Sequence, residues 1–370
     1  MVRVDSRELR RFTEALLVEL GVPNRSAEQV AESLVDADLH GHGSHGVRRI
    51  VSQYAAEIEA GRIDPTAEPI VESDACAVGR VEGRKSFGHL AARTALDLCV
   101  QKADTHGAGA VGLKGSTHIG RIGEWIERGT SEGKVVLAFV CNPETKWVSP
   151  PGSAQRRFST NPIAIGMPTF DAVGFPIVVD IATSQVASGK IAKYAAAGEK
   201  VPSDWLIAPD GDELVDPNRY VEAGEGALLP LGGRTSGYKG FCLALLSELL
   251  AATLSDGDVS GMDCSFGGNQ AAFLAIDPER FTSRERTVER AAALAAYVRE
   301  TEFLDVVSRE TEISDDYALL PGEAEHRSAK RRRDEGIPLS RNDARSLRDL
   351  SRRHALRDDL VPDVISNVDG

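Results

Sequence analysis

Cysteine is scarce in this chain, and long apolar runs are missing. The 370 residues include five cysteines, an odd number without any C-x-x-C pair, which argues against a disulfide framework and indicates a reducing compartment. The longest apolar run, residues 241–254, is broken by Ser247 and Glu248 and is too short to cross a bilayer. The first residues lack the apolar stretch of a signal peptide. We therefore expect a cytoplasmic protein with no membrane partner.

Net positive charge is also absent. The formal charge of -13 argues against a nucleic-acid or anionic-membrane partner, because either one would require a basic face. The one dense basic cluster, residues 330–333, is followed at once by Asp334 and Glu335. We interpret it as a solvated helix face rather than a binding patch.

The common nucleotide-binding motifs are missing as well. No G-x-G-x-x-G follows a strand pattern, and "GRVEGRKS" at 79–86 has one residue too few between its glycines for a P-loop. A bound dinucleotide would therefore not use the Rossmann fingerprint.

What is present is the pattern of a globular α/β protein. The chain is 42% apolar and 27% charged, and its length predicts about two domains. Ser6 and a Ser26-x-x-Gln29 capping box predict the starts of two N-terminal helices. Further helices are expected at 88–105, 121–133 and 283–299 and from about 338, and strands at 109–113, 135–140, 161–168, 175–182 and 271–277. This alternation predicts a mixed sheet.

The stretch "LHGHGSHGVRRI" places His40, His42 and His45 within six positions. Histidine serves equally as a metal ligand, a proton-transfer group or a polar residue at a turn. A metal site would need a nearby acid, such as Asp36 or Asp38, and would suit a metal-dependent hydrolase or lyase. The stretch alone leaves these alternatives open.

Four other positions could contact a ligand. Lys239 lies near the start of a helix that is apolar on nearly every side, which predicts burial of the helix and an anion site at its first turn; the alternative is a lysine that extends to solvent. Asp180 ends an apolar strand and could hold a ribose or cap a helix. His118 lies in a glycine-flanked turn, and Asn161 could hydrogen-bond an amide or a carboxylate.

In order along the chain, "GSHGVRRI", "GSTHIGRIGEW", "STNPIAIGMP", "VVDIATSQVASGKI", "GGRTSGYKGFCLALLSELLAATLSDG", "AIDPERF" and "LLPGEAE" resemble the malate/L-lactate dehydrogenase family of the second type. The resemblance implies a non-Rossmann, sulfolactate dehydrogenase-like α/β fold with a helical substrate and dimerisation region. It implies a homodimer that transfers a hydride between NAD or NADP and a small 2-oxo acid, or alternatively a cyclic 2-imino acid.

The resemblance also implies residue roles. His45, beside Ser44, matches the general acid/base; Arg49 matches the arginine that holds the substrate carboxylate, and His118 matches a histidine beside the reacting carbonyl. The positions that match cofactor-contacting segments are Asn161, Asp180, Ile181, Ala182, Thr183, Ser184, Lys190, Tyr238, Lys239, Gly322 and Glu323. No metal is implied, because an imidazole with an ordinary pKa can supply the proton.

We expect residues 1–75 to form a helical catalytic segment, 76–300 the cofactor-binding region, and 301–370 a segment that packs back on the N-terminal region and ends in a polar tail. Two features depart from the family pattern. The aromatic residue usually found four places after the arginine is replaced by Gln53, with Tyr54 one place later, and residues 141–153 differ around Lys146 and Trp147. The second departure also allows an inactive relative that serves as an accessory protein.

Overall fold

The centre of the molecule is a seven-stranded mixed sheet. The computed structural model describes residues 1–264, 266, 268–301 and 318–369, so part of the predicted C-terminal segment, residues 302–317, lies outside the described residues. The strand order is β2 (Ile70–Ala75), β3 (Val78–Glu82), β4 (Ala108–Ser116), β10 (Asn269–Ile276), β5 (Val135–Cys141), β6 (Ile163–Met167) and β7 (Ile177–Ile181). Only β3 and β4 pair in parallel among these neighbours. The predicted mixed α/β fold is confirmed.

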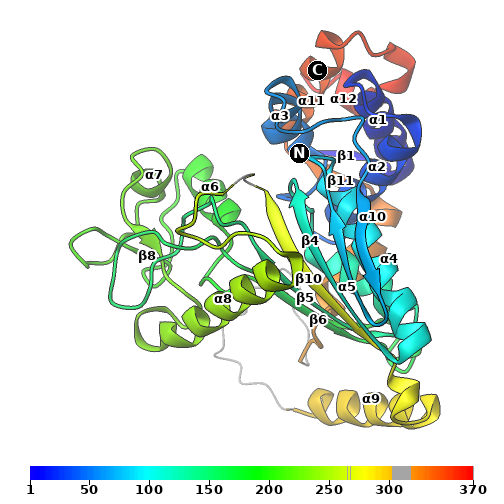
Figure 1. The fold of residues 1–370 in the computed structure, drawn as a ribbon. Helices are drawn as coiled ribbons and strands as arrows, with labels where there is room; N and C mark the ends of the chain where they lie inside the picture. Colours follow the sequence, from blue (N-terminus) through cyan, green and yellow to red (C-terminus); the bar gives the residue numbers. More distant parts are fainter. Residues whose placement is uncertain (265, 267, 302–317, 370) are drawn as a thin grey trace.

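Helices cover both faces of the sheet (Figure 1). On one face lie α4 (Gly88–His106) and α5 (Ile122–Ser131), whose buried side chains share a core with the strands. On the other face lies α8 (Gly233–Ser255), which packs on β10, β4 and β5. A glycine-rich turn connects the end of β4 to the start of α5. This turn therefore lies at the carboxyl end of β4.

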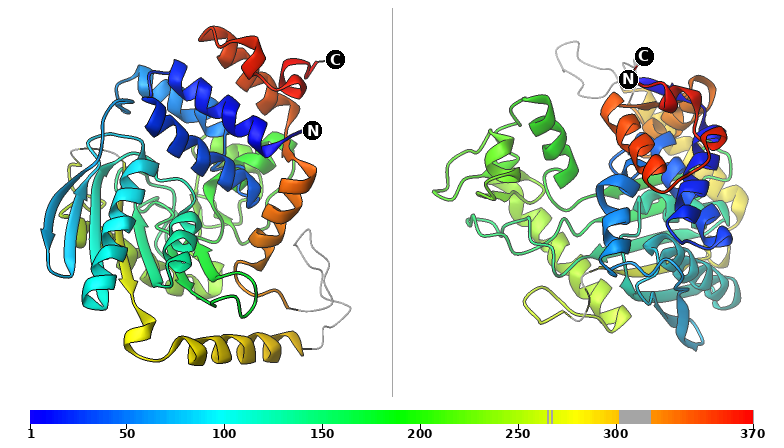
Figure 2. Two further views of the ribbon diagram at one scale, coloured as in Figure 1. Left: turned by 90° about the vertical axis from the view of Figure 1, so that its right-hand side faces the viewer. Right: turned by 90° about the horizontal axis from the view of Figure 1, so that it is seen from above.

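A helical layer made from both ends of the chain lies beside the sheet (Figure 2). It contains α1 (Ser6–Glu19), α2 (Asn24–Leu39), α3 (Ala55–Glu59), α10 (Glu323–Glu335), α11 (Arg341–Arg353) and α12 (Asp363–Ser366). The two-stranded sheet of β1 (Val2–Val4) and β11 (Ile337–Leu339) joins the two ends. We call this layer the terminal cap.

The last thirty residues belong to the terminal cap. Helix α11 is amphipathic, as its pattern predicts, and buries Ala344, Leu347 and Leu350. The segment after it was expected to be a polar tail, but Ile365 and Val368 are buried in the core of the cap. The few apolar residues of this segment therefore attach it to the core of the cap.

A third apolar cluster lies away from the sheet, in a lobe formed by residues 142–160 and 183–232 (Figure 1). It holds α6 (Ser188–Ala197), α7 (Pro217–Val221) and the short pair β8 (Leu206–Ile207) and β9 (Ala227–Leu228). Trp147, from the unusual segment 141–153, packs against this cluster. The molecule thus has separate cores in the cap, the sheet and the lobe, while the boundaries 1–75, 76–300 and 301–370 stay a prediction.

Two predicted helix caps are wrong. Helix α1 is capped by Asp5, whose carboxylate accepts hydrogen bonds from the backbone of Arg7 and Glu8, instead of by Ser6. Helix α2 begins at Asn24 directly after Pro23, and the predicted capping box at Ser26 does not form. The fixed φ of proline already directs the chain into the first turn, so Ser26 falls inside the helix and is buried.

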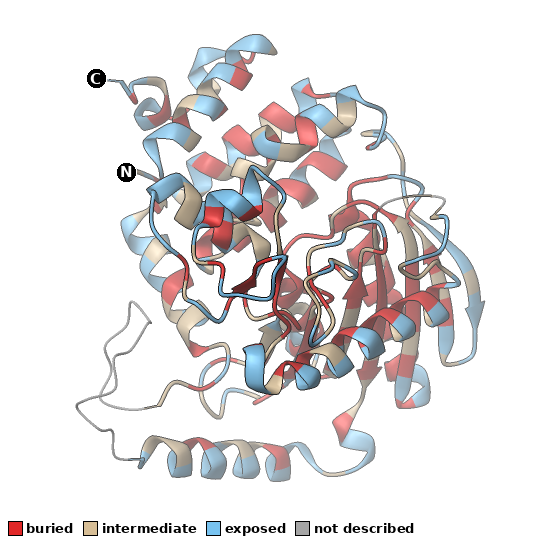
Figure 3. Cartoon of the chain, turned by 90° about the vertical axis from the view of Figure 1, so that its left-hand side faces the viewer, coloured by how far each residue is buried: buried red, intermediate tan, exposed pale blue. Residues whose placement is uncertain are grey.

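Helix α8 is not buried as its composition predicted. Its outer face exposes Tyr238, Leu246 at 53% and Leu249 at 48%, because only the face toward the sheet has neighbours in this chain. Among the described helices it is the one long and apolar enough to cross a membrane by composition, which is weak support for such a role. Helix α9 (Arg284–Arg299) is also exposed along most of its length (Figure 3).

Candidate active site

A hydrogen bond to the buried carboxylate of Asp38 fixes the loop that follows α2. Asp38 accepts a hydrogen bond from the Val47 backbone N–H at 2.8 Å, and Arg332 of α10 donates to the Asp38 carbonyl at 2.5 Å. A Cβ atom on Gly46 would lie 2.1 Å from the Asp38 carboxylate, so only glycine fits there. Burial raises the pKa of Asp38 to about 7. The terminal cap therefore determines where the loop with His45 sits.

His45 and His118 form a stacked pair at the junction of the cap and the sheet. Their ring centroids are 5.4 Å apart and the rings are inclined by 25°. His45 Nδ1 is hydrogen-bonded to Ser44 Oγ at 3.0 Å, while His118 Nδ1 is hydrogen-bonded to the Tyr54 hydroxyl at 3.0 Å. Both histidines are only half-buried, so the pair borders open space.

Arg49 is oriented by the same loop. Its Nε donates to the Ser44 carbonyl at 2.7 Å, and its terminal nitrogen donates to Gln53. Gln53 in turn donates to Glu57 at 3.0 Å. The π-helical turn Ile50–Tyr54 follows Arg49 directly. Such a turn takes up one extra residue, and Tyr54 at its end reaches His118.

Both histidines of the pair are neutral in the free protein. Burial, reinforced by the positive charge of Arg49, lowers the pKa of His45 to about 3. The same two causes, in the same order, lower the pKa of His118 well below its ordinary value. The site therefore opposes an added proton unless a negative charge enters it.

His40, His42 and His45 do not converge on one point. His40 pairs with Asp36 and Glu127, His42 pairs with Glu325 at 3.5 Å, and His45 bonds to Ser44. Burial works against the charged form of His40, but the hydrogen bond and charge of Asp36 outweigh it and raise its pKa.

A guanidinium lies between the carboxylates that could otherwise bind a cation. Within the described part of the chain, Asp36, His40 and Glu127 form the one group with metal-ligand spacing. The buried Arg121 bonds to Asp36 at 2.9 Å and to Glu127 at 2.5 Å. This arrangement argues against the metal-dependent alternative built on the three histidines.

Asp180 acts as a helix cap in this structure. Its carboxylate accepts from the backbone N–H of Gly123, in the first turn of α5, at 2.7 Å. Burial raises the pKa of Asp180, and the hydrogen bond from Gly123 opposes that rise. Of the two roles that its strand-end position allows, capping is the one observed, although it caps α5 rather than the following helix.

Three of the predicted cofactor residues are buried and fully engaged with the protein. The Asn161 amide donates to Glu248 at 2.7 Å and to the Ala244 carbonyl at 3.1 Å, and accepts from Ser159. Thr183 and Ser184 donate to backbone carbonyls. These side chains connect strand ends to α8 and to the lobe, so a ligand here would contact backbone atoms rather than these side chains. Ile181 and Ala182, which precede Thr183, are less buried.

Lys190 on α6 and Tyr238 and Lys239 on α8 have exposed side chains. Lys190 is exposed, and its amine stands 4.9 Å from the centre of the Trp205 ring. Tyr238 and Lys239 are exposed on α8, where Lys239 falls in the second helical turn rather than at the predicted anion site. The start of α6 does approach the loop, because a Cβ on Gly189 would lie 3.5 Å from Ser44 Cβ.

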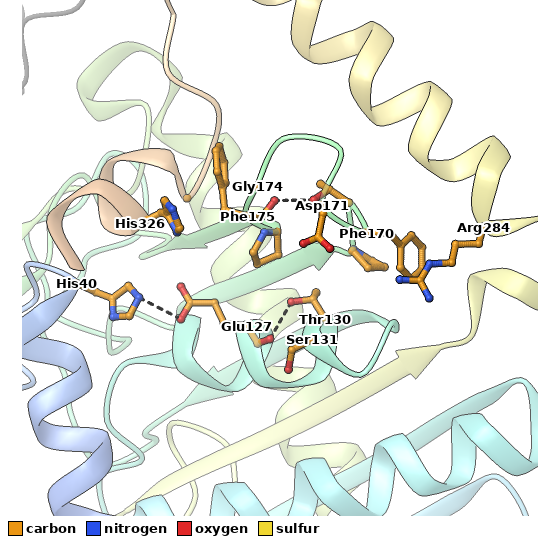
Figure 4. Close-up of a pocket in the computed structure, with 14 residues that line it drawn as sticks. His40, Glu127, Thr130, Ser131, Phe170, Asp171, Gly174, Phe175, Arg284 and His326 are labelled. Carbon is orange, nitrogen blue, oxygen red and sulfur yellow. Dashed lines mark hydrogen bonds and ion pairs between the residues drawn. The ribbon is translucent and has the colours of Figure 1, made fainter. Parts of the chain in front are cut away.

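Gly322 and Glu323 begin α10 beside a cavity of about 400 Å³ (Figure 4). Glu323 is buried and forms ion pairs with Arg299 of α9 and Arg327 of α10. These ion pairs fix the first turn of α10. Gly322 lines the cavity, and the rings of Phe175 and His326 stack on its wall at 5.3 Å. His40, Glu127, Thr130 and Arg284 line other sides.

Sequence reasoning missed several residues that build this site. Asp38 was considered only as a metal ligand, Tyr54 only as a departure in spacing, and Arg121 not at all. The signal for Asp38 is the glycine eight residues later, but recognising it requires the folded contact. Their roles depend on neighbours that are distant in sequence.

A stacked imidazole pair beside an oriented guanidinium is suited to moving a proton on a substrate that carries a carboxylate. Residues 4–348 match the model of the malate/L-lactate dehydrogenase family. The chain belongs to this family and is an oxidoreductase.

Hydroxycarboxylate dehydrogenase B of Escherichia coli K12 is 30% identical over 364 residues, which cover 97% of this chain and 96% of that one. The Δ1-pyrroline-2-carboxylate/Δ1-piperideine-2-carboxylate reductase of Pseudomonas putida is 30% identical over 363 residues, or 95% and 97% of the two chains. The crystal structure of Entamoeba histolytica malate dehydrogenase superposes with a TM-score of 0.89 at 25% identity, covering 96% and 99%.

Proposed function

We propose that the protein is a NAD(P)-dependent oxidoreductase that interconverts a small 2-oxo acid and its 2-hydroxy acid. The observation that carries the proposal is the stacked pair of His45 and His118 beside Arg49. Arg49 holds the substrate carboxylate, since a guanidinium binds a carboxylate through two parallel hydrogen bonds. His45 exchanges a proton with the substrate oxygen. His118, the other ring of the stacked pair, contacts the same oxygen.

The residues along β7 fit an extended dinucleotide. The cavity at Gly322 lies at the start of β7, and the backbone after its end leads to Gly189, which approaches Ser44. These segments would hold the cofactor, with its nicotinamide at the histidine pair and its other end toward the cavity. The bound nicotinamide supplies or accepts the hydride. The chain's own residues bind and orient the substrate and move the proton.

Substrate binding changes the proton affinity of His45. The charge of Arg49 helps to lower the pKa of His45, and a bound carboxylate neutralises that charge. A bound carboxylate therefore removes one of the causes that lower the pKa of His45, so that His45 is better able to protonate a carbonyl oxygen in the complex. In the reverse direction the 2-hydroxy acid binds while His45 is neutral, and the imidazole accepts the hydroxyl proton within the complex.

A substrate panel crossed with both cofactors tests the proposal. We expect absorbance changes of NADH or NADPH with 2-oxo acids, and loss of that turnover in His45→Ala while cofactor binding survives in a fluorescence titration. Retained turnover in His45→Ala would contradict the role of His45. No turnover with any 2-oxo acid under either cofactor would contradict the proposed reaction.

The panel must include cyclic 2-imino acids, because one relative of equal identity is a reductase named for such compounds. The nitrogen of a cyclic imine is basic enough to take a proton from water and bind as the iminium, so its reduction depends less on an acid of the protein. If imino acids are the substrates, His45→Ala should slow their reduction far less than it slows 2-oxo acid reduction.

We also propose that the protein is a homodimer and that the outer face of α8 forms the interface. Tyr238, Leu243, Leu245, Leu246 and Leu249 are exposed together on this one helix. A contiguous apolar surface of this kind is rare on a monomer and is typical of subunit contacts.

A further inference from the structure

The two imidazoles of the active site are held by different kinds of partners. His45 Nδ1 contacts one group, the Ser44 hydroxyl, which can both donate and accept a hydrogen bond. His118 Nδ1 contacts two groups, the Tyr54 hydroxyl at 3.0 Å and the backbone N–H of Gly120 at 3.3 Å. A backbone N–H can only donate, so the two nitrogens are not equivalent.

The Gly120 contact determines the tautomer of His118. Because this N–H points at Nδ1, Nδ1 carries no proton and must accept. The Tyr54 hydroxyl then also donates to Nδ1, because an unprotonated imidazole nitrogen can only accept a hydrogen bond. A neutral imidazole with a bare Nδ1 carries its proton on Nε2. No described residue accepts from this Nε2–H, and the ring is only half-buried, so the Nε2–H is available to a ligand.

Tyr54 is well suited to this single task. Its side chain is fully buried, with its ring edge-on to Phe87 at 5.6 Å and to His89 at 5.9 Å. Burial raises the pKa of Tyr54, so its hydroxyl keeps the proton that it donates. Within the described residues this hydroxyl has no second partner. The π-helical turn Ile50–Tyr54 supplies the extra residue that carries the ring to this position.

We propose that Tyr54 is a positioning residue that fixes His118 as a permanent Nε2–H donor to the substrate's 2-oxygen, leaving His45 as the only member of the pair that exchanges a proton. This inference rests on the proposed function. The two histidines then have different roles. His45 gains and loses a proton during turnover, whereas His118 donates a hydrogen bond that stabilises the substrate oxygen as negative charge develops on it.

Tyr54→Phe tests the inference, because it keeps the buried ring and removes only the hydroxyl. The expected result is a fall in kcat of about 10- to 100-fold, smaller than the loss of a direct donor to the reacting oxygen. The KM for the 2-oxo acid and the affinity for the cofactor should stay within about twofold, since Arg49 and the cavity are untouched. Tyr220→Phe is the matched control, because Tyr220 is a buried tyrosine of the distant lobe whose hydroxyl has no hydrogen-bond partner in the described structure. Its kcat should be unchanged.

Nitrogen-15 NMR of the histidine-labelled protein reads the tautomer directly, with the His118 signals assigned by their loss in His118→Asn. The wild type should show a protonated Nε2 and an unprotonated Nδ1, and Tyr54→Phe should shift these signals toward a mixture of tautomers. An unchanged kcat in Tyr54→Phe, or a protonated Nδ1 in the wild type, would overturn the inference. If the protein reduces no 2-oxo or 2-imino acid, the proposed function fails, whereas the NMR result still decides the tautomer.

Discussion

His45 illustrates how the surroundings of one side chain set its chemistry. An exposed histidine has a pKa near 6.5, whereas burial and Arg49 lower the pKa of His45 to about 3 in the free protein. In the proposed mechanism the neutral imidazole accepts a proton in one direction and, once a substrate anion has entered, donates a proton in the other. This dependence on substrate has a kinetic signature.

The pH profiles of the two kinetic constants should differ. For oxidation of the 2-hydroxy acid, kcat/KM reports the free enzyme and kcat reports the complex. We expect kcat/KM to show no loss from His45 protonation between about pH 5 and pH 8, because the free residue stays neutral there. In contrast, kcat should fall as the pH drops through a raised pKa in the complex. A fall of kcat/KM below an inflection near pH 6.5 would contradict a buried neutral base.

Gly46 shows a steric requirement at the same scale. A methyl group there would lie 2.1 Å from the Asp38 carboxylate, so Gly46→Ala should push the loop off its support. We expect a loss of about 1–3 kcal/mol in the free energy of unfolding, typical of overpacking, together with a large loss of kcat. Urea unfolding and steady-state assays measure both.

Gly43→Ala is the matched control, because its Cβ would stand 3.4 Å from an oxygen of the same carboxylate. It should cost much less stability than Gly46→Ala. Equal costs for the two variants would mean that the contact with Asp38 does not constrain the loop.

At the scale of elements, periodicity and turn chemistry predicted most helices and strands of the sheet, including β5, β6, β7 and β10. The failures have specific causes. The capping box at Ser26 did not form because Pro23 had already started the helix. Burial of α8 was wrongly predicted because a sequence cannot distinguish a core face from an exposed apolar face. The motifs located His45 and His118, but the partners Asp38 and Tyr54 required long-range contacts that no local pattern reports.

The outer face of α8 carries the prediction of a homodimer. Placing charges there with Leu246→Asp and Leu249→Asp should convert a particle of twice 39.7 kDa into one of 39.7 kDa, measured by light scattering after gel filtration. Burying two carboxylates in an apolar interface without partners costs several kcal/mol. Val221→Asp, which adds a charge to an exposed residue of the lobe, should leave the mass unchanged. A wild-type protein that runs as a monomer would contradict this prediction.

At the scale of the whole molecule, the cap and the sheet are joined by a buried carboxyl. Glu124 of α5 accepts a hydrogen bond from Ser33 of α2 at 2.7 Å, and burial raises the pKa of Glu124 to about 8 from an ordinary value of 4.5. Between these values the folded protein holds a proton that the unfolded chain has lost. Global stability must therefore fall as the pH rises through this window.

Glu124→Gln should remove that pH dependence. The amide cannot ionise, so the free energy of unfolding of the variant should decline less steeply between about pH 5 and pH 8, by up to about 1.4 kcal/mol per pH unit relative to the wild type. Chemical unfolding at several pH values measures the difference. Glu132→Gln, at the exposed end of the same helix, is the control and should follow the wild type. Parallel curves for Glu124→Gln and the wild type would contradict a buried neutral carboxyl.

The pairing of β1 with β11 has a consequence for how the protein is made. Val4 lies opposite Ile337, so during synthesis Val4 waits for a partner that follows it by 333 residues. The sheet and the lobe can assemble during that interval, since their strands and helices lie between these two segments. The cap that supports Asp38 and His45 closes last, and a nascent chain interrupted before residue 337 would carry a folded sheet without a working catalytic loop.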